Sequence, residues 1–553
     1  MTTTNTMSTL RKTLLIVIFL IVALHLIAIT FYLYPKNPIS FHSHGHHDRL
    51  EPSEFAKLGR WGPSIPLPLV PVAMAILPTS GKVLLWSADN PRVFSNSTTH
   101  TLTALLDLRT GTVTPHNVTQ THHNMFCPGL SLDASGRVVI TGGSSPLSTS
   151  IYDPTAEAWL EGPPLTTGRG YHSQATLSDG RIFTIGGSWS GRDTEPKNGE
   201  ILSFSSSSSS ESVGQWQPLP SALALPMHTL DPRGPFAADN HAWLFAWSNN
   251  SIFQAGPSRN MNWYSPDHHT PAGLRSTSPD SMNGNAVLFS ASPQTGGKIL
   301  TLGGAEAYSL APATSSAYLI SLPVSPFSTP SITKLPDMHH PRTYANAVIL
   351  PTGDVFIVGG ATYARQWTDK NATLVPEVFH ADNHTFTELA PMAVARTYHS
   401  VAALLPDGAV LVGGGGLCWE LCEEDESQVN HLDVQVYEPG YLFPAGGERP
   451  KILEVDNTRV RAGGRMVVCV GGRVKEFALL RYVSVTHAVN TDQRRIELDA
   501  VVLAQVGAAH VYEIQVPEDS GIAVPGYWML FAISQTGVPS VAETILIEAS
   551  ANS

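Results

Sequence analysis

Five side chains have the chemistry of a transition-metal site: Cys127 in HHNMFCPG, Tyr171 in GRGYHS, the pair Tyr398 and His399 in ARTYHS, and His487 in VTHAVNTDQRR. Two imidazoles and two phenolate oxygens would form an N₂O₂ set, and tetragonal nitrogen and oxygen sites suit Cu(II). Free tyrosine has a pKa of about 10, so a tyrosine ligand implies a strong Lewis acid that removes its proton. Each residue alone also fits a packed or hydrogen-bonded loop side chain, and spacing does not show that Tyr171 meets His487.

The elements that must position these loops belong to a repeated β unit. A hydrophobic strand ending in Gly-Gly recurs as VVITGG, RIFTIGG, KILTLGG, DVFIVGG and AVLVGGGG, and turns such as LDASGR, LSDGR and LPDGA precede it. Such Gly-containing pairs are typical of β-hairpins, and a four-stranded repeat of about 50 residues is the kelch pattern. A ring of such units buries faces that one unit cannot. We therefore predict an all-β protein with a seven-bladed kelch β-propeller over residues 59–445.

The sequence pattern changes after Arg449. The Gly-Gly strands stop, and alternating runs such as RMVVCV, EFALLRYVSV and VYEIQV are separated by turns. Several short alternating strands over about 100 residues are typical of an immunoglobulin-like sandwich. We therefore expect such a β-sandwich over residues 446–553, with Cys469 as a buried apolar thiol on one of its core strands.

The N-terminal region predicts export. Thr13 to Tyr34 is a 22-residue stretch without a charged side chain, long enough as a helix to cross a bilayer. Arg11 and Lys12 precede it, which places the tail 1–12 in the cytoplasm and the rest of the chain outside. We expect a single-pass type II membrane anchor at 13–34 and a stalk at 35–58, or a secreted protein if the segment is cleaved.

Other features agree with an extracellular location. Cys418 and Cys422 are close enough in sequence to form a disulfide in that oxidising environment. Asn-x-Ser/Thr acceptor triplets for N-glycosylation occur at Asn96, Asn117, Asn249, Asn371 and Asn383. The formal net charge is −12 and the sequence has no basic cluster, which argues against a nucleic-acid partner.

The ordered strings MFCPG, FTIGGSWSG, GGGGLC, VNTDQRR and VPGYWMLF resemble galactose oxidase and its copper-radical oxidase relatives, from about Gly59 to Glu548. The family fold is a seven-bladed propeller followed by an immunoglobulin-like domain, which agrees with the repeat pattern. The resemblance implies one Cu(II) ion with equatorial Tyr171, axial Tyr398 and the imidazoles of His399 and His487 as ligands. The histidine of the C-terminal domain would reach the ion on a loop that threads up the propeller axis.

The resemblance also implies a protein-derived cofactor and a reaction. A thioether bond would join Cys127 to Tyr171, and Trp189 would stack over the modified ring and shield its radical. Copper and this radical would each accept one electron from an alcohol, with Tyr398 taking the hydroxyl proton and Tyr171 a hydrogen atom from the carbinol carbon. The aldehyde would leave, and O₂ would be released as H₂O₂.

The substrate pocket is expected to differ from that of galactose oxidase. Ser309 stands where the sugar oxidase has a glutamine, and Trp367 where it has a phenylalanine. Loss of a polar anchor weakens discrimination between hydroxylated substrates, and a larger aromatic side chain favours apolar ones. We therefore expect aryl or aliphatic primary alcohols rather than galactose. The matched pocket positions are Phe94, Arg275, Tyr308, Ser309 and Trp367.

Three alternatives remain open at this point. The same copper site could serve a galactose oxidase or a glyoxal or aldehyde oxidase, and the chain could be a non-catalytic kelch module that only binds a partner. The partners implied are a small-molecule alcohol, O₂ and the membrane. A peroxidase that consumes H₂O₂ is a candidate partner, and a monomer is the default expectation.

Overall fold

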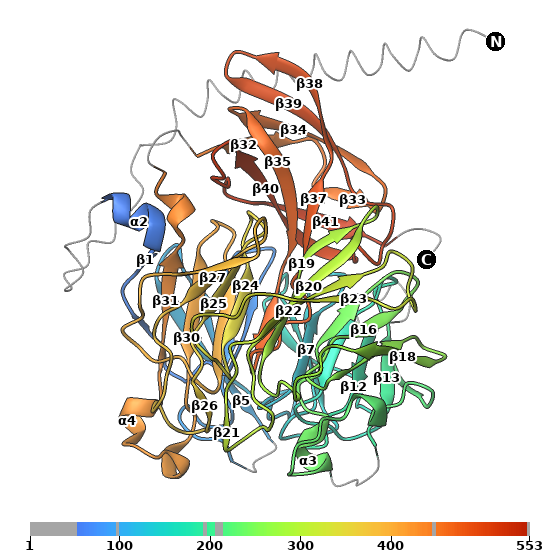
Figure 1. Ribbon diagram of the computed structural model, residues 1–553, viewed down its shortest axis with the longest axis vertical. Coiled ribbons are helices and arrows are strands. Elements are labelled where there is room, and N and C mark those ends of the chain that lie inside the picture. The colour runs from blue at the N-terminus through green and yellow to red at the C-terminus, as the bar shows by residue number, and fades with distance from the viewer. Residues whose placement is uncertain (1–51, 96–98, 192–195, 205–213, 445–448, 550–553) are drawn as a thin grey trace.

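The computed structural model describes residues 52–95, 99–191, 196–204, 214–444 and 449–549 (Figure 1). The predicted membrane segment 13–34, the first part of the predicted stalk and Asn96 lie outside the described residues. No helix in the described part of the chain is long and apolar enough to cross a membrane. The last part of the predicted stalk forms helix α2 (Pro52–Leu58), which packs against the short helix η3 (Gly440–Leu442).

The described chain is an all-β fold with few helical residues. Seven antiparallel sheets of four or five strands follow one another between residues 60 and 438, an arrangement consistent with the blades of a β-propeller. The seventh sheet contains the first strand of the described chain, β1, paired with β31, so the two ends of this region close on each other. Ordered along the chain, the sheets are β3 (Ala73–Ile76), β4 (Val83–Trp86), β5 (Thr101–Asp107) and β6 (Thr112–Val118); β7 (Gly129–Leu132), β8 (Val138–Thr141), β9 (Thr149–Asp153) and β10 (Ala158–Glu161); β11 (Ser173–Thr176), β12 (Ile182–Ile185), β13 (Gly199–Ser203) and β14 (Gln215–Leu219); β15 (Leu244–Ala246), β16 (Ile252–Gln254), β17 (Asn260–Tyr264) and β18 (His269–Leu274); β19 (Asn285–Ser292), β20 (Gly296–Leu302), β22 (Ala317–Leu322) and β23 (Ser331–Lys334); β24 (Asn346–Ile349), β25 (Val355–Val358), β27 (Glu377–His380) and β28 (Thr385–Glu388); and β29 (Ser400–Leu404), β30 (Val410–Gly414), β31 (Asp433–Glu438), β1 (Arg60–Trp61) and β2 (Ile65–Pro66).

The Gly-Gly pairs follow the second strand of a sheet because the chain turns there against the next sheet. Gly142 and Gly359 have φ angles of 61° and 70°, in the left-handed region that a Cβ disfavours. A Cβ on Gly142 would also overlap the carbonyl oxygen of Arg169, and one on Gly359 would overlap that of Arg396. A close backbone contact between neighbouring sheets therefore explains why the Gly-Gly pair recurs in the sequence. The β15–β18 sheet lacks this signature and fills the long gap between two of the repeats.

The C-terminal domain consists of two further sheets. One contains β32 (Lys451–Val455), β34 (Arg465–Gly471), β39 (Ala509–Gln515) and β38 (Ala500–Val506); the other contains β33 (Arg459–Arg461), β41 (Glu543–Glu548), β40 (Gly526–Ser534), β35 (Val474–Arg481) and β37 (Arg495–Leu498). Their buried side chains share one apolar cluster with the sheets β15–β18 and β19–β23, which includes Trp247, Trp263, Phe477, Ile514 and Trp528. Burial of such large side chains, each contributing about 1.5–3 kcal/mol, fixes the domain on this side of the seven sheets.

Figure 1 shows the C-terminal domain at one end of the molecule, with the short elements α3 (Pro235–Ala238), α4 (Glu426–Val429), β21 (Ala311–Pro312) and β26 (Tyr363–Ala364) at the opposite end. Two other single-turn helices are present, η1 (Leu225–Met227) and η2 (Trp419–Leu421). Cys418 and Cys422 form a disulfide across the loop that contains η2.

Candidate metal centre

Loops from four parts of the chain bring the five candidate side chains together. The phenol oxygens of Tyr171 and Tyr398 lie 2.5 Å apart, and Cys127 Sγ lies 3.5 Å from His487 Nε2. Ligand atoms of Cys127, His399 and His487 all lie within 4.8 Å of one another, and the three residues are buried. Tyr171 and Tyr398 are also buried, at 5% and 3% exposure. The sequence motifs thus converge on one buried point although up to 360 residues separate them.

The two histidines are oriented so that Nε2 faces this point. His399 donates its Nδ1–H to the carbonyl of Gly416 over 2.6 Å. The Thr486 hydroxyl donates to Val72 O and therefore accepts from Nδ1–H of His487 over 2.7 Å. With Nδ1 protonated, each Nε2 keeps a lone pair, the arrangement typical of a metal-bound imidazole. His399 Nε2 is buried and has no hydrogen-bond partner among the described residues.

His487 reaches the centre because a strand of the C-terminal segment crosses into the first sheet. β36 (Ser484–Thr486) pairs with β3 through Ala73 and Thr486. The loop that follows is buried, with Asp492 accepting the backbone N–H of Leu132 over 3.0 Å. Thr491 and Gln493 also donate to backbone carbonyls of the seven sheets. A C-terminal loop therefore runs along the first strands of three sheets, β7, β11 and β24.

Several of the converging residues have a left-handed backbone. The φ angles are 60° for Cys127, 64° for Tyr171, 70° for His399 and 49° for His487. Residues other than glycine seldom adopt this region, and clusters of them are typical of functional sites held in place by their surroundings. The strained loops therefore need strong anchors.

Buried arginines anchor two of these loops. Arg169 and Arg396 each lie two residues before a tyrosine of the centre, and each donates Nη1–H to the carbonyl of a repeat glycine, Gly186 directly after β12 and Gly414 at the end of β30. Arg169 forms an ion pair with Glu200 over 2.8 Å, with both side chains at most 1% exposed. Arg396 pairs with Asp433 over 2.7 Å. A buried charge that loses its partner is costly, so these ion pairs fix the positions of the loops that contain Tyr171 and Tyr398.

The Arg396–Asp433 pair gives a pH-dependent prediction. Burial raises the pKa of Asp433, but the hydrogen bonds and charge of Arg396 outweigh it and leave this pKa below 3.8. The stabilisation that this ion pair gives the fold is therefore present above pH 3.8 and is lost as the pH falls through the lowered pKa of Asp433. We expect Asp433→Asn to lower the free energy of unfolding by about 1–3 kcal/mol at neutral pH. Urea unfolding at several pH values should show this difference shrinking in acid; an unchanged difference, or the same effect in the exposed Asp382→Asn control, would contradict the pairing.

Burial sets the charge of the centre. It raises the pKa values of Tyr171, Tyr398 and Cys127 well above their ordinary values, and neighbouring phenol and thiol groups raise that of Tyr171 further. Burial also lowers the pKa of His399 to about 3 and that of His487 well below its ordinary value. The protein alone thus favours neutral phenols and imidazoles. A cation at the centre would favour phenolate oxygens and unprotonated imidazoles together, so the donor set fits a metal ion.

Aromatic rings enclose the centre. The Trp189 ring stacks on Tyr171 with centroids 4.6 Å apart and an angle of 25°. Trp367 packs edge-on against Tyr398 at 5.0 Å and stacks with Phe94 at 5.6 Å. Phe94, Trp189 and Trp367 are partly exposed whereas the tyrosines are buried. These three rings therefore lie between the centre and solvent.

The other predicted pocket residues divide into two groups. Tyr308 is 2% exposed, and its phenol oxygen lies 3.0 Å from that of Tyr398. Ser309 is half-buried beside it and accepts a hydrogen bond from Gln366 Nε2 over 2.7 Å. Arg275 is not part of this group. It is 2% exposed, donates to Pro257 O and Ser281 Oγ, and lies over the ring of Trp243, so the prediction that its side chain lines the pocket is wrong.

Sequence reasoning missed four residues of the site. Phe126, next to Cys127, stacks on Phe94 at 4.7 Å. His241 hydrogen-bonds Tyr308 over 3.1 Å and stacks on His487 at 5.1 Å. Gln366 supplies an amide beside Ser309, and the exposed Arg233 places its guanidinium 5.7 Å from the Tyr308 ring. The motif DNHAW around His241 and the position of Phe126 within MFCPG were available signals. Gln366 and Arg233 lie in irregular loops, where no sequence motif indicated them.

Comparison with known proteins agrees with the geometry. Residues 87–441 match the family described as glyoxal oxidase N-terminus, and residues 449–547 match the galactose oxidase-like, Early set domain. The chain is 44% identical to a galactose oxidase of Gibberella zeae, over 89% of this chain and 71% of that protein. It is 28% identical to an aldehyde oxidase of Arabidopsis thaliana, over 80% of this chain and 74% of that protein. A solved fungal alcohol oxidase of the AA5 family, in complex with copper, has a TM-score of 0.81 and 38% identity, over 89% of this chain and 100% of that one.

Proposed function

The chain belongs to the galactose oxidase-like family of copper-radical oxidases, and from this membership we propose that it oxidises aryl or aliphatic primary alcohols to aldehydes while reducing O₂ to H₂O₂. The observation that carries the proposal is the buried centre in which the phenols of Tyr171 and Tyr398 lie 2.5 Å apart beside Cys127, His399 and His487. The cofactor is a copper ion together with a thioether-linked cysteine and tyrosine, in line with the copper-containing relative.

The residues present fit copper. Nε2 of His399 is buried without a hydrogen-bond partner among the described residues, and Nε2 of His487 is turned the same way by Thr486. We assign these two nitrogens and the phenol oxygens of Tyr171 and Tyr398 as the ligands. Copper bound there would supply one of the two electron acceptors that alcohol oxidation requires, the other being the modified tyrosine.

Side chains of the protein would accept the proton and stabilise the radical. Tyr398 Oη would accept the hydroxyl proton of the alcohol, and it is positioned for this by the phenol of Tyr308 at 3.0 Å. Tyr308 is in turn held by His241. Cys127 lies against Tyr171, where the thioether would extend the aromatic system onto sulfur. The stacked Trp189 ring covers Tyr171 and keeps water from it.

The mouth of the centre favours a substrate with an apolar body. Trp367 and Phe94 form an aromatic wall beside Tyr398. The loss of polarity expected at Ser309 is only partial, because Gln366 from another loop places its amide there. An apolar pocket with a few polar groups at one side suits an aryl or alkyl chain carrying a single reactive hydroxyl. Galactose has several hydroxyls to satisfy, so we propose that it is a poor substrate.

We expect Trp367→Ala to lower kcat/KM for benzyl alcohol by about tenfold or more, mainly through KM. The ring supplies apolar contact in the bound state rather than a group that reacts. Steady-state H₂O₂ release at matched copper content measures the effect. Phe327→Ala is the control, because Phe327 packs against Trp263 in another part of the chain. Equal losses in both variants, or a pure loss of kcat, would contradict this role for Trp367.

An aldehyde or glyoxal oxidase is the second candidate function. The family model over residues 87–441 and the Arabidopsis relative favour it, and it would use the same ligands. The experiment that separates the functions is H₂O₂ release by the copper-loaded chain on benzyl alcohol, 1-hexanol, galactose and methylglyoxal. Turnover of the first two supports the alcohol oxidase. Preference for galactose or for methylglyoxal would assign the chain to one of the alternatives.

We also propose the finer architecture and location. The seven sheets and their recurrent Gly-Gly turns support a kelch propeller over 59–445, and the two C-terminal sheets support an immunoglobulin-like sandwich over 446–553. The uncharged segment 13–34 after Arg11 and Lys12 supports a membrane-anchored or secreted extracellular enzyme. We propose that it acts as a monomer and that a peroxidase consumes its H₂O₂.

A further inference from the structure

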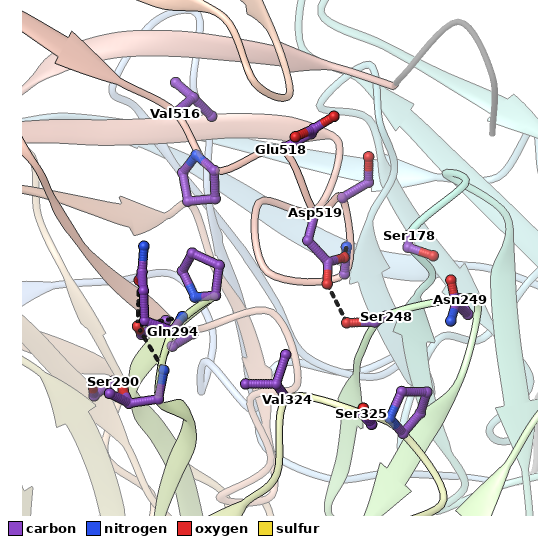
Figure 2. Close-up of a pocket in the computed structure, with 18 of the residues that line it drawn as sticks. Ser178, Ser248, Asn249, Ser290, Gln294, Val324, Ser325, Val516, Glu518 and Asp519 are labelled. Carbon is purple, nitrogen blue, oxygen red and sulfur yellow. Dashed lines mark hydrogen bonds between the residues drawn. The ribbon is translucent and has the colours of Figure 1, made fainter.

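A large groove lies where the C-terminal domain meets the sheets, away from the metal centre. Its volume is about 1050 Å³, and Figure 2 shows the side chains that line it. On one side are turns of three sheets, which contribute Ser178, Asn249, Gln294 and Ser325 among others. Across from them is the loop after β39, with Glu518 and Asp519. Hydroxyl, amide and carboxylate groups dominate this lining.

The floor of the groove is a tight contact between the two parts of the molecule. The Ser248 hydroxyl donates to the Asp519 carboxylate, and a Cβ on Gly521 would overlap the backbone of Trp247 and Ser248. Arg494 donates to Gly521 O over 2.7 Å and to Ala246 O over 2.9 Å. The turn between β15 and β16 is therefore fixed against the C-terminal domain.

That turn contains an N-glycosylation triplet. Asn249, Asn250 and Ser251 follow Ser248, and Asn249 is exposed at the tip with a φ angle of 56°. Asn249 lines the groove, whereas the described acceptors Asn117, Asn371 and Asn383 do not. Its side-chain amide is thus an attachment point at the edge of a space lined by groups that hydrogen-bond sugars.

We propose that Asn249 carries an N-linked glycan whose inner sugars lie in this groove and join the seven sheets to the C-terminal domain. The proposal relies on the extracellular location proposed above and is independent of the oxidase activity. In the modification, the Asn249 amide nitrogen loses a proton and bonds to the anomeric carbon of a lipid-diphosphate-linked oligosaccharide, and the lipid diphosphate leaves. The donor is the common one of the eukaryotic secretory pathway.

The composition of the groove fits a tethered sugar better than a free one. None of the described residues that line it is aromatic, so they offer no stacking platform for a sugar ring and little affinity for a dissolved saccharide. A glycan attached at its edge has a high effective concentration and needs little intrinsic affinity. Carboxylates of Glu497, Asp499 and Glu518 would accept hydrogen bonds from its hydroxyls, and hydroxyls of the serine-rich turns would donate hydrogen bonds to it.

The test compares glycans within one protein. The full chain is produced in a eukaryotic secretory host, site occupancy is measured by glycopeptide mass spectrometry, and the folded protein is treated with a peptide N-glycosidase. We expect Asn249 to be occupied and its glycan to be released at least about tenfold more slowly than that of Asn383, because the inner sugars must first leave the groove. Asn383 is exposed in the turn between β27 and β28 and serves as the internal control.

A variant pair tests the effect on stability. Asn249→Gly keeps a residue that tolerates the left-handed backbone and removes the glycan; Asn371→Gly is its matched control, because Asn371 is an exposed acceptor with a φ angle of 65°. We expect a lower Tm for Asn249→Gly than for the control, with copper content unchanged in both. An unoccupied Asn249, or a glycan released from folded protein as fast as that of Asn383, would overturn the proposal. Alcohol oxidation is measured separately, so a failed activity assay would not be confused with either result.

Discussion

Cys127→Ser is expected to lower kcat for benzyl alcohol by more than about a thousandfold, a loss of roughly 4 kcal/mol of transition-state stabilisation. Serine is close to cysteine in size, so the buried loop should keep its shape, including the hydrogen bond from the Tyr171 amide to Cys127 O at 2.9 Å. Without sulfur no thioether can form, and Tyr171 remains an ordinary phenol that is harder to oxidise. Because Cys127 is not among the proposed ligands, copper content should stay close to that of the wild type.

The matched control is Cys469→Ser. Cys469 is the other free cysteine of the described chain, is buried, and lies on β34 of the C-terminal domain. We expect it to retain wild-type turnover with a modest loss of stability. Steady-state H₂O₂ release and copper analysis on the same preparations separate catalysis from metal binding. Wild-type turnover in Cys127→Ser, or equal losses in both variants, would contradict the role of the thioether.

His487→Ala is expected to lower copper affinity by more than about a hundredfold and to remove alcohol oxidation with it. The reason is the loss of an oriented nitrogen donor, since Nε2 of His487 faces the centre while Nδ1 is held by Thr486. Thr486→Val leaves the imidazole but removes the hydroxyl that fixes its orientation. Changes at such supporting groups cost about 10- to 100-fold in metal affinity, so Thr486→Val should lie between the wild type and His487→Ala.

Copper competition against a chelator of known affinity measures this order. His510→Ala is the control, because His510 is a partly exposed histidine on β39 of the same domain. We expect it to bind copper like the wild type. If His487→Ala bound copper as tightly as the His510→Ala control, the ligand set would have to be assigned differently.

The residues of the centre could be recognised in the sequence because they lie in short motifs beside the repeated turns. Tyr171 and Tyr398 each follow an arginine by two residues, and that arginine binds the carbonyl of a repeat glycine. The local pattern therefore contains its own anchor. The position of His487 depends on the pairing of β36 with β3. Nothing local to VTHAVN specifies this long-range pairing, and only the resemblance indicated it.

The mouth of the site was predicted less well. Arg275 matched a pocket position in a comparison that crosses loops of variable length, yet its guanidinium is buried against Trp243. Gln366 and Arg233 occupy the space near Tyr308 instead. The conformation of an irregular loop depends on tertiary packing rather than on a repeated sequence pattern. A one-residue shift in the alignment of such a loop therefore assigns the wrong side chain to the substrate pocket. Tyr171 and Tyr398 are protected from such a shift, because the contacts of Arg169 and Arg396 with repeat glycines fix their positions.

The most direct test of the central claim is peptide mapping of the chain after incubation with Cu(II) and O₂. We expect a cross-linked species that joins the peptide containing Cys127 to that containing Tyr171, with the loss of two hydrogen atoms relative to the separate peptides. The species should be absent from Cys127→Ser and from protein kept free of copper. Separate, unmodified Cys127 and Tyr171 peptides in protein that is loaded with copper and oxidises benzyl alcohol would contradict it.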